Sequence, residues 1–272
     1  MNIFKRAYIR YILHRHAIPH DLWTEATEKL IVLQGMTAVE KAHLRELTTL
    51  FLHKKQFLGV QELQLTDAMC LLIAAQACLP VLGLGIDSLS GWTEIIVYPS
   101  AFRTNRDERD SAGVVHHQEQ ALVGESWSRG PLILSWDDVE RDLQGKQPGR
   151  NVVIHEMAHK LDVLNGPADG FPPLHQGMAL IEWSTSLSAA YESLVRQVEH
   201  QHCACINPYA TTNPAEFFAV ISEYFSVRRR FCTNTLSMFI CNSSIITGKI
   251  RCCVATLGSK NIIPAAGNQA YD

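Results

Sequence analysis

Two histidines four residues apart, His155 and His159, stand in the stretch VVIHEMAHKLD, and Glu156 directly follows the first. On a helix, residues four apart lie on one face, so both imidazoles can reach a single point. Zinc binds such nitrogens at about 2.0 to 2.1 Å in tetrahedral geometry. Glu156 would lie about 100° further round the helix, where it can hydrogen-bond a water on the metal without binding the metal. These residues predict the ligands and general base of a zinc hydrolase.

The alternative is a pair of core histidines that satisfy one another. Val152–Ile154 and Met157–Ala158 give the expected helix an apolar face for burial. Buried histidines need a partner, because an unpaired polar group away from water costs free energy. A metal ion and a hydrogen-bonded pair both meet that need, and the pattern favours the metal.

A catalytic zinc site needs a third protein ligand and leaves a fourth position for water. One class of peptidase follows the pattern HExxHxxGxxH, but Asp162 and Asn165 occupy the places of that glycine and histidine, so this class is excluded. The stretch NPAEFFAVISEYF offers two carboxylates instead. Glu216 and Glu223 are seven residues apart and share one helix face. We expect Glu216 to bind zinc and Glu223 to be paired with a histidine ring or a backbone donor.

Glu216 also has a purely structural interpretation. Asn213 followed by Pro214 is typical of a helix start. Glu216 then stands at the third helical position, where a glutamate can close a capping box. The spacing leaves ligand and cap open.

Several helices must position these residues. Residues 21–58 predict two helices, the first with Asp21 as N-cap and the second opened by the capping box Thr37–Glu40. The apolar run 69–86 is interrupted by Gln76 and Pro80, which favours a buried helix ending near Pro80 over a membrane span.

The second half of the chain mixes strands and helices. Residues 93–99 and 130–136 are short apolar or β-branched runs bounded by Gly and Pro, typical of strands. The charged run 103–111 is expected to be a solvated loop. Helical patterns cover residues 178–201 and 214–227. The plan is an α+β fold with a helical amino-terminal part.

Composition limits the function classes. The chain has 272 residues, 47% of them apolar, enough for a sizeable core. A net charge of -3 leaves no basic stripe, which argues against direct nucleic-acid binding. Charged residues interrupt the amino terminus, so no secretory signal is recognised and we expect a cytoplasmic protein. The eight cysteines contain no CxxC pair and are expected to be free thiols.

Four stretches carry a family resemblance: IHEMAHKLD, GPLILSW, LPVLGLGIDSLSGWTEIIVYP and YATTNPAEFFAVISEYF. They resemble the Mlc titration factor A family of bacterial cytoplasmic zinc peptidases, over about residues 20–226. The resemblance implies a zincin-like catalytic fold similar to that of anthrax lethal factor. It also implies that His155, His159 and Glu216 bind Zn²⁺ and that Glu156 is the base.

The same resemblance points to Tyr209, seven residues before Glu216. A phenol near the metal can donate to the oxyanion that forms when water attacks a carbonyl. A tyrosine that packs at a helix start is an equally good interpretation of Tyr209. For His116 and His117 we expect a surface or packing role.

The resemblance implies a division and an activity. Residues 1–90 form a helical part packed on the core, 91–226 a zincin-like catalytic domain, and 227–272 an aberrant tail. The implied activity is aminopeptidase-like hydrolysis of peptides. We expect residues 130–136 to supply an edge strand on which the peptide lies. The implied partner is an Mlc-type transcriptional repressor that controls the glucose phosphotransferase system, with no membrane partner. The alternative is a non-catalytic regulator that binds the repressor and keeps a structural or vestigial zinc site.

The tail differs from the family. After Ser226 the chain lacks helical periodicity and holds half of the eight cysteines. Permitted codons for residues 226–254, read two bases later, can give RAPEILYQYFIDVYLQLINYYRENPLLR, a family-like amphipathic helix without a stop. We therefore predict that the tail from about Val227 is an out-of-frame translation.

Overall fold

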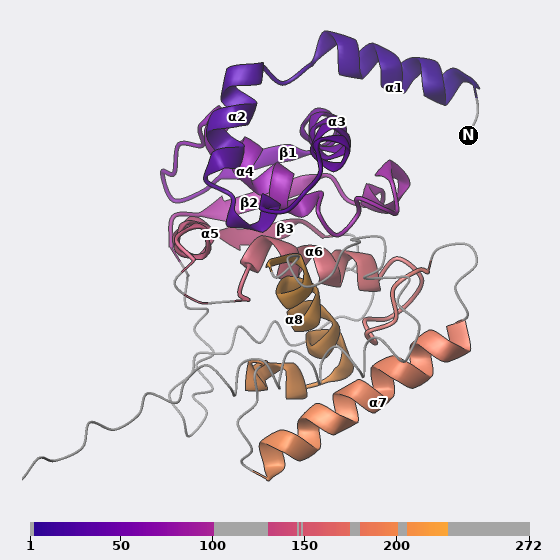
Figure 1. The fold of residues 1–272 in the computed structure, drawn as a ribbon. Coiled ribbons are helices and arrows are strands. Elements are labelled where there is room, and N and C mark those ends of the chain that lie inside the picture. Colours follow the sequence, from indigo (N-terminus) through magenta and orange to yellow (C-terminus); the bar gives the residue numbers. More distant parts are fainter. Residues whose placement is uncertain are drawn as a thin grey trace, which may run out of the picture.

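The computed structural model describes residues 3–100, 130–145, 147, 149–174, 180–200 and 206–227, and these contain helices and a small sheet (Figure 1). The α-helices are α1 (Ile3–Arg15), α2 (His20–Glu28), α3 (Ala38–Lys54), α4 (Asp67–Ala77), α5 (Trp136–Leu143), α6 (Val152–Asp162), α7 (Leu180–Glu199) and α8 (Pro214–Val227). Short 3₁₀ turns are η1 (Ile31–Leu33), η2 (Ile86–Leu89) and η3 (Pro208–Thr211). The strands are β1 (Gln56–Gly59), β2 (Glu94–Tyr98) and β3 (Leu132–Ser135).

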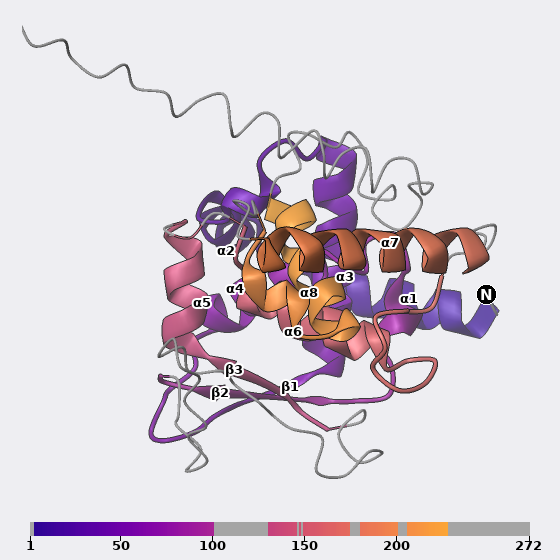
Figure 2. The ribbon, with the colours of Figure 1, turned by 90° about the horizontal axis from the view of Figure 1, so that it is seen from below.

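The three strands form a parallel sheet in the order β1-β2-β3. Phe57 pairs with Ile95, and Ile95 in turn pairs with Leu132. Alternate residues of β2 and β3 are buried, as expected of strands with one face on the core. Figure 2 shows the described helices gathered on one side of the sheet.

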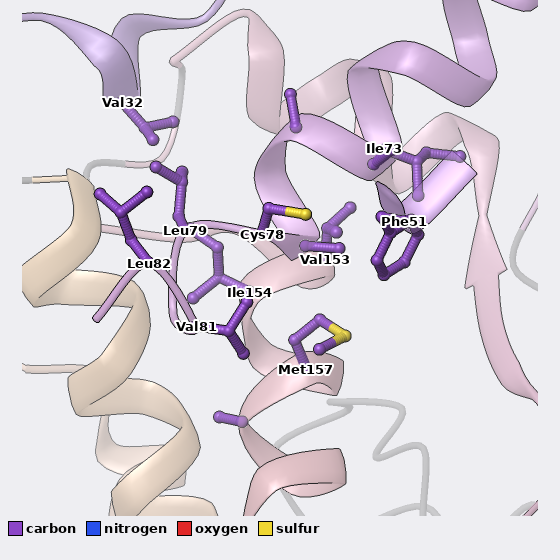
Figure 3. Close-up of a cluster of buried hydrophobic side chains, with 14 of the residues drawn as sticks. Val32, Phe51, Ile73, Cys78, Leu79, Val81, Leu82, Val153, Ile154 and Met157 are labelled. Atoms are coloured by element: carbon purple, nitrogen blue, oxygen red, sulfur yellow. The ribbon is translucent and has the colours of Figure 1, made fainter. Parts of the chain in front are cut away.

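The core joins the amino-terminal helices to the helix that carries the two histidines. Val153, Ile154 and Met157 of α6 are fully buried. They pack beside residues that follow α4, among them Cys78 and Val81 (Figure 3). The expected apolar face of the VVIHEMAHKLD helix is thus confirmed. Burial of this face leaves His155 and His159 on the other side of the helix.

Local signals placed several elements correctly. The capping box of α3 is present, with Thr37 accepting from the Glu40 N–H and the Glu40 side chain accepting from the Thr37 N–H. Helix α4 ends at Ala77, three residues before Pro80, because proline cannot continue the hydrogen-bonding pattern. Strand β2 and helices α7 and α8 lie within the expected ranges.

Other expectations were wrong or incomplete. Asp21 is not the N-cap of α2, because the helix begins at His20 with Pro19 before it and Asp21 lies in the first turn. The strand expected to reach Trp136 ends at Ser135, whose hydroxyl accepts the Asp138 N–H and starts α5. The helical range expected to reach residue 58 was wrong at its end, because α3 ends at Lys54 and residues 56–59 pair with β2 as β1. Helix α1 was not predicted.

Some expectations fall on residues outside the described part of the chain. These are the charged run 103–111, His116, His117, the tail after Val227, and six cysteines: Cys203, Cys205, Cys232, Cys241, Cys252 and Cys253. Among the described residues, Cys70 and Cys78 are free thiols. The helices of the described part are all too short or too polar to cross a membrane.

Candidate metal centre

Helix α6 presents the two histidines, and its start is held by three acceptors. Asn151 is the N-cap, and its Oδ1 accepts from the Ile154 N–H at 3.0 Å. Asp142 accepts from the Val152 N–H at 2.7 Å, and Glu223 accepts from the Asn151 N–H at 2.5 Å. Because the first N–H groups of a helix have no partner inside it, these contacts fix where α6 begins.

Helix α8 brings the first carboxylate to the histidines. Asn213 Oδ1 accepts from the Glu216 N–H at 2.9 Å, as expected of an N-cap. The Glu216 carboxylate lies against the histidines, with Oε2 3.2 Å from Nε2 of His155. Asn213 therefore caps the helix through the Glu216 N–H, while the Glu216 side chain faces the histidines instead of closing a capping box.

The three side chains converge on one point. Nε2 of His155 lies 3.2 Å from Nε2 of His159, and Glu216 Oε2 lies 3.5 Å from Nε2 of His159. Ligands at about 2.0 to 2.1 Å from a tetrahedral zinc ion are separated by about 3.3 Å. The measured separations of 3.2, 3.2 and 3.5 Å bracket that value. Within the described residues this is the one cluster of three such side chains able to hold a metal ion.

The hydrogen positions show why this point suits a cation. Nδ1 of His155 lies 2.7 Å from Glu223 Oε1, and a carboxylate can only accept, so Nδ1 carries the hydrogen. In the neutral ring, Nε2 then carries a lone pair that faces His159 and Glu216. Glu216 Oε2 is buried and has no hydrogen bond within the described part of the chain. A proton or a metal ion must lie between these lone pairs.

Without a metal, the proton takes that place. Burial disfavours the charged His155 ring, but its contacts with Glu216 and Glu223 outweigh burial and raise the pKa of His155 to about 10. Burial would raise the pKa of Glu216, but the two histidines outweigh it and hold that pKa well below its usual range. Metal binding would therefore displace a proton from His155.

Glu156 and Tyr209 border the same point. Glu156 is half-buried, and its negative charge contributes to the raised pKa of both His155 and Tyr209. The Tyr209 ring lies 6.3 Å from the His155 ring, centroid to centroid. Burial, then the charge of Glu216 and a hydrogen bond with it, raise the pKa of the Tyr209 phenol above its usual value. A phenol held protonated can donate a hydrogen bond.

Turn η3 positions Tyr209. Asn207 Oδ1 accepts from the Tyr209 N–H at 3.0 Å, and the Tyr191 hydroxyl of α7 donates to the Thr211 carbonyl at 3.0 Å. The packing interpretation of Tyr209 is thus compatible with a place beside the histidines.

The structure brings together the predicted ligands, base and phenol, which are His155, Glu156, His159, Tyr209 and Glu216. It also gives Glu223 both partners expected for it, the His155 ring and a backbone N–H. Sequence reasoning missed the acceptors that fix the start of α6, Asn151 and Asp142. Asn151 could have been found, because asparagine before an apolar helical run is an N-cap signal. Asp142 has no such signal, since its pairing with Val152 depends on how α5 lies beside α6.

A family model and several relatives match most of the chain, including the residues of this site. The family model of glucose-regulated metallo-peptidase M90 matches residues 4–234. A protein of Escherichia coli O9:H4 (strain HS) named Mlc titration factor A is 37% identical over 217 residues, which are 78% of each chain. Proteins of the same name from Salmonella arizonae and Klebsiella pneumoniae (strain 342) are 38% and 37% identical. These matches cover 75% of this chain and 81% and 76% of the two relatives.

Proposed function

The chain belongs to the family of glucose-regulated metallo-peptidases M90, and on that premise we propose that it is a zinc-dependent peptidase with an aminopeptidase-like activity. His155, His159 and Glu216 would bind Zn²⁺, and Glu156 and Tyr209 would act on the substrate. We propose that residues 91–226 form the zincin-like catalytic domain, that residues 1–90 pack on it, and that the protein acts in the cytoplasm.

The observation that carries this proposal is the convergence of three potential ligand atoms at separations of 3.2 to 3.5 Å. Two imidazole nitrogens and a carboxylate oxygen are ligands that zinc prefers, and three protein ligands leave a fourth position for water. Glu223 supports the same assignment, because a carboxylate on the far nitrogen of a histidine fixes the tautomer that a metal needs.

The chain's own residues account for the proton transfers. Bound zinc would lower the pKa of a water molecule and polarise the peptide carbonyl. Glu156 takes the proton from the attacking water and delivers it to the leaving amine. The Tyr209 phenol donates to the oxyanion as the carbonyl becomes tetrahedral.

We propose that the peptide lies along β3, the last strand in the order of the described sheet. An extended peptide can add to such a strand through backbone hydrogen bonds. Lys160 of α6 donates to the Gly130 carbonyl at 2.9 Å, which ties the segment just before β3 to the helix that carries the histidines. Substrate and ligands would then be held by one rigid unit.

Glu156→Gln tests the catalytic role. The amide cannot accept a proton, while the three zinc-facing side chains stay as they are. We expect zinc bound at one ion per chain and peptide turnover reduced by about 10²- to 10⁴-fold, the usual contribution of a general base. Removing zinc with a chelator should abolish wild-type turnover, and added zinc should restore it. Undiminished turnover by the variant would exclude Glu156 as the base.

A second function is favoured by the names of the relatives, Mlc titration factor A. We propose that this chain also binds an Mlc-type repressor. Wild-type protein and a His155→Ala, His159→Ala double variant should be compared for binding to purified repressor. Retained binding together with loss of peptidase activity would show two separate functions. Binding by a wild-type protein that shows no peptidase activity would favour the purely regulatory alternative.

A further inference from the structure

A chain of buried hydrogen bonds runs from α4 to His155. It begins at Gln76, the polar residue that interrupts the apolar run 69–86. Gln76 is 1% exposed, and its Nε2 donates to the Leu72 carbonyl at 3.0 Å within α4. Its Oε1 accepts from Nδ2 of Asn151 at 2.6 Å. A buried amide that satisfies both its ends in this way is held in one orientation.

Asn151 is held in one orientation as well. Its Oδ1 accepts from the Ile154 N–H, so its Nδ2 must be the donor to Gln76. A flipped Asn151 amide would place an NH₂ group against the Ile154 N–H and an oxygen against Gln76 Oε1. Both contacts would be repulsive, so Gln76 and the helix start together select the observed side-chain orientation.

The chain then crosses to α8 and ends at the histidine. The Asn151 N–H donates to Glu223 Oε2 at 2.5 Å, and the other oxygen of this carboxylate accepts from Nδ1 of His155. Asn151 and Glu223 are 3% and 5% exposed, so water competes little with these bonds. An unbroken path of bonds with defined directions therefore links the Leu72 carbonyl to the ring of His155.

We infer that Gln76 and Asn151 are positioning residues for His155, which they orient through Glu223. This inference rests on the proposed zinc site. The purely structural alternative is that Gln76 fills the core and Asn151 only caps α6. Under that alternative, breaking the contact between the two amides would lower stability and leave the histidine unaffected.

Two variants break the contact between the amides while sparing the rest of the site. Gln76→Met keeps the side-chain length and removes both the donor and the acceptor of the Gln76 amide. Asn151→Ser keeps an oxygen that can cap α6 but lacks the amide that reaches Gln76. Thr48→Val is the matched control, because Thr48 is also fully buried and bonded to its own helix at Leu44. Its other partner is the Cys78 thiol, which is outside the chain of bonds from Gln76 to His155.

The first measurement is the zinc dissociation constant, determined by competition with a chromophoric chelator. Loss of a partner bonded directly to a ligand weakens metal binding about 10- to 100-fold. Asn151 acts one residue further out and Gln76 two, so we expect Gln76→Met and Asn151→Ser each to weaken binding by about tenfold, the lower end of that range. Thr48→Val should stay within about twofold of wild type.

Two further readouts separate positioning from stability. The visible spectrum of the Co²⁺-loaded protein reports ligand geometry, and we expect it to change in both variants and not in Thr48→Val. Peptide turnover should fall in kcat with KM unchanged, because the substrate contacts remain. If Gln76→Met does not fold, Asn151→Ser carries the test alone.

The outcomes distinguish this inference from the proposed function. If wild type binds zinc and both variants bind it equally well with an unchanged Co²⁺ spectrum, the positioning role is wrong and the peptidase proposal stands. If wild type binds no zinc, the proposed function is wrong. The NMR signal of the His155 Nδ1–H in the metal-free protein then decides the inference, which predicts faster exchange of that proton in both variants. Unchanged exchange would overturn it.

Discussion

Gly170 lies where the loop after α6 meets the start of α8, and replacing it with alanine tests how the two helices are held together. Its φ is +83°, a left-handed conformation that costs an alanine about 1 to 2 kcal/mol. A Cβ at this position would lie 2.5 Å from the Pro214 carbonyl oxygen and 2.9 Å from the Pro214 carbonyl carbon. Both are backbone atoms, so no side-chain rotation relieves the clash.

The expected loss follows from these two contributions. Overpacking of a rigid neighbour costs about 1 to 3 kcal/mol, so Gly170→Ala should lower the free energy of unfolding by about 2 to 5 kcal/mol. The Gly170 N–H also donates to Asp162 Oδ2 at 2.8 Å, and a shifted loop would weaken that bond. Because Pro214 precedes Glu216 by two residues, zinc binding should weaken about tenfold, or about 1.4 kcal/mol.

Gly35→Ala is the control. Gly35 has a similar φ of +87°, and no atom of the described residues lies within 4 Å of a Cβ built there. Gly35→Ala should lower the free energy of unfolding only by the cost of the left-handed conformation, about 1 to 2 kcal/mol, and should keep wild-type zinc affinity. Urea unfolding of the metal-free proteins, with unchanged m-values, measures the difference. Equal destabilisation by the two substitutions would refute the clash, and unchanged zinc affinity in Gly170→Ala would refute its effect on Glu216.

Three further predictions concern the metal, pH and the tail. Glu216→Ala should leave a chain that holds less than one zinc ion after dialysis, and full retention would exclude Glu216 as a ligand. Burial, partly offset by the Val152 N–H and Arg150, raises the pKa of Asp142 to about 6. The folded state therefore favours the protonated Asp142 carboxyl. The stability that this proton adds is fully present below about pH 4 and is lost as the pH rises through 6. Urea unfolding should show the free energy of unfolding of Asp142→Asn rising relative to that of wild type between about pH 4 and pH 6. A difference between the two proteins that does not change with pH would contradict this. Sequencing the coding DNA should reveal a shifted frame near Val227, whereas codons for residues 226–254 that do not permit the alternative helix would rule it out.

The sequence predicted elements best where the signal is local. Thr37 and Glu40 form the expected capping box because both partners lie within one helical turn. Asn213 and Pro214 likewise placed the start of α8. Strand β1 gave no such signal, because four residues with half-exposed side chains become a strand only by pairing with β2.

For the candidate site, too, the sequence predicted what depends on local spacing and left open what depends on tertiary packing. The spacing of His155 and His159 determined by itself that both rings share a face, since the helix repeat fixes it. The sequence offered Glu216 as ligand or as cap, and Glu223 as a partner of a histidine or of a backbone group, and the structure gives Glu223 both partners.

Those choices depend on the tertiary structure. Sixty residues separate His155 from Glu216, and no local rule sets the distance between their side chains. The packing of α8 beside α6 turns Glu216 toward both histidines and Glu223 toward the far nitrogen of one of them. The residue types and their local spacing are therefore determined by the sequence alone. Which acceptors meet at one point is decided by the burial of apolar faces that holds α4, α6 and α8 together.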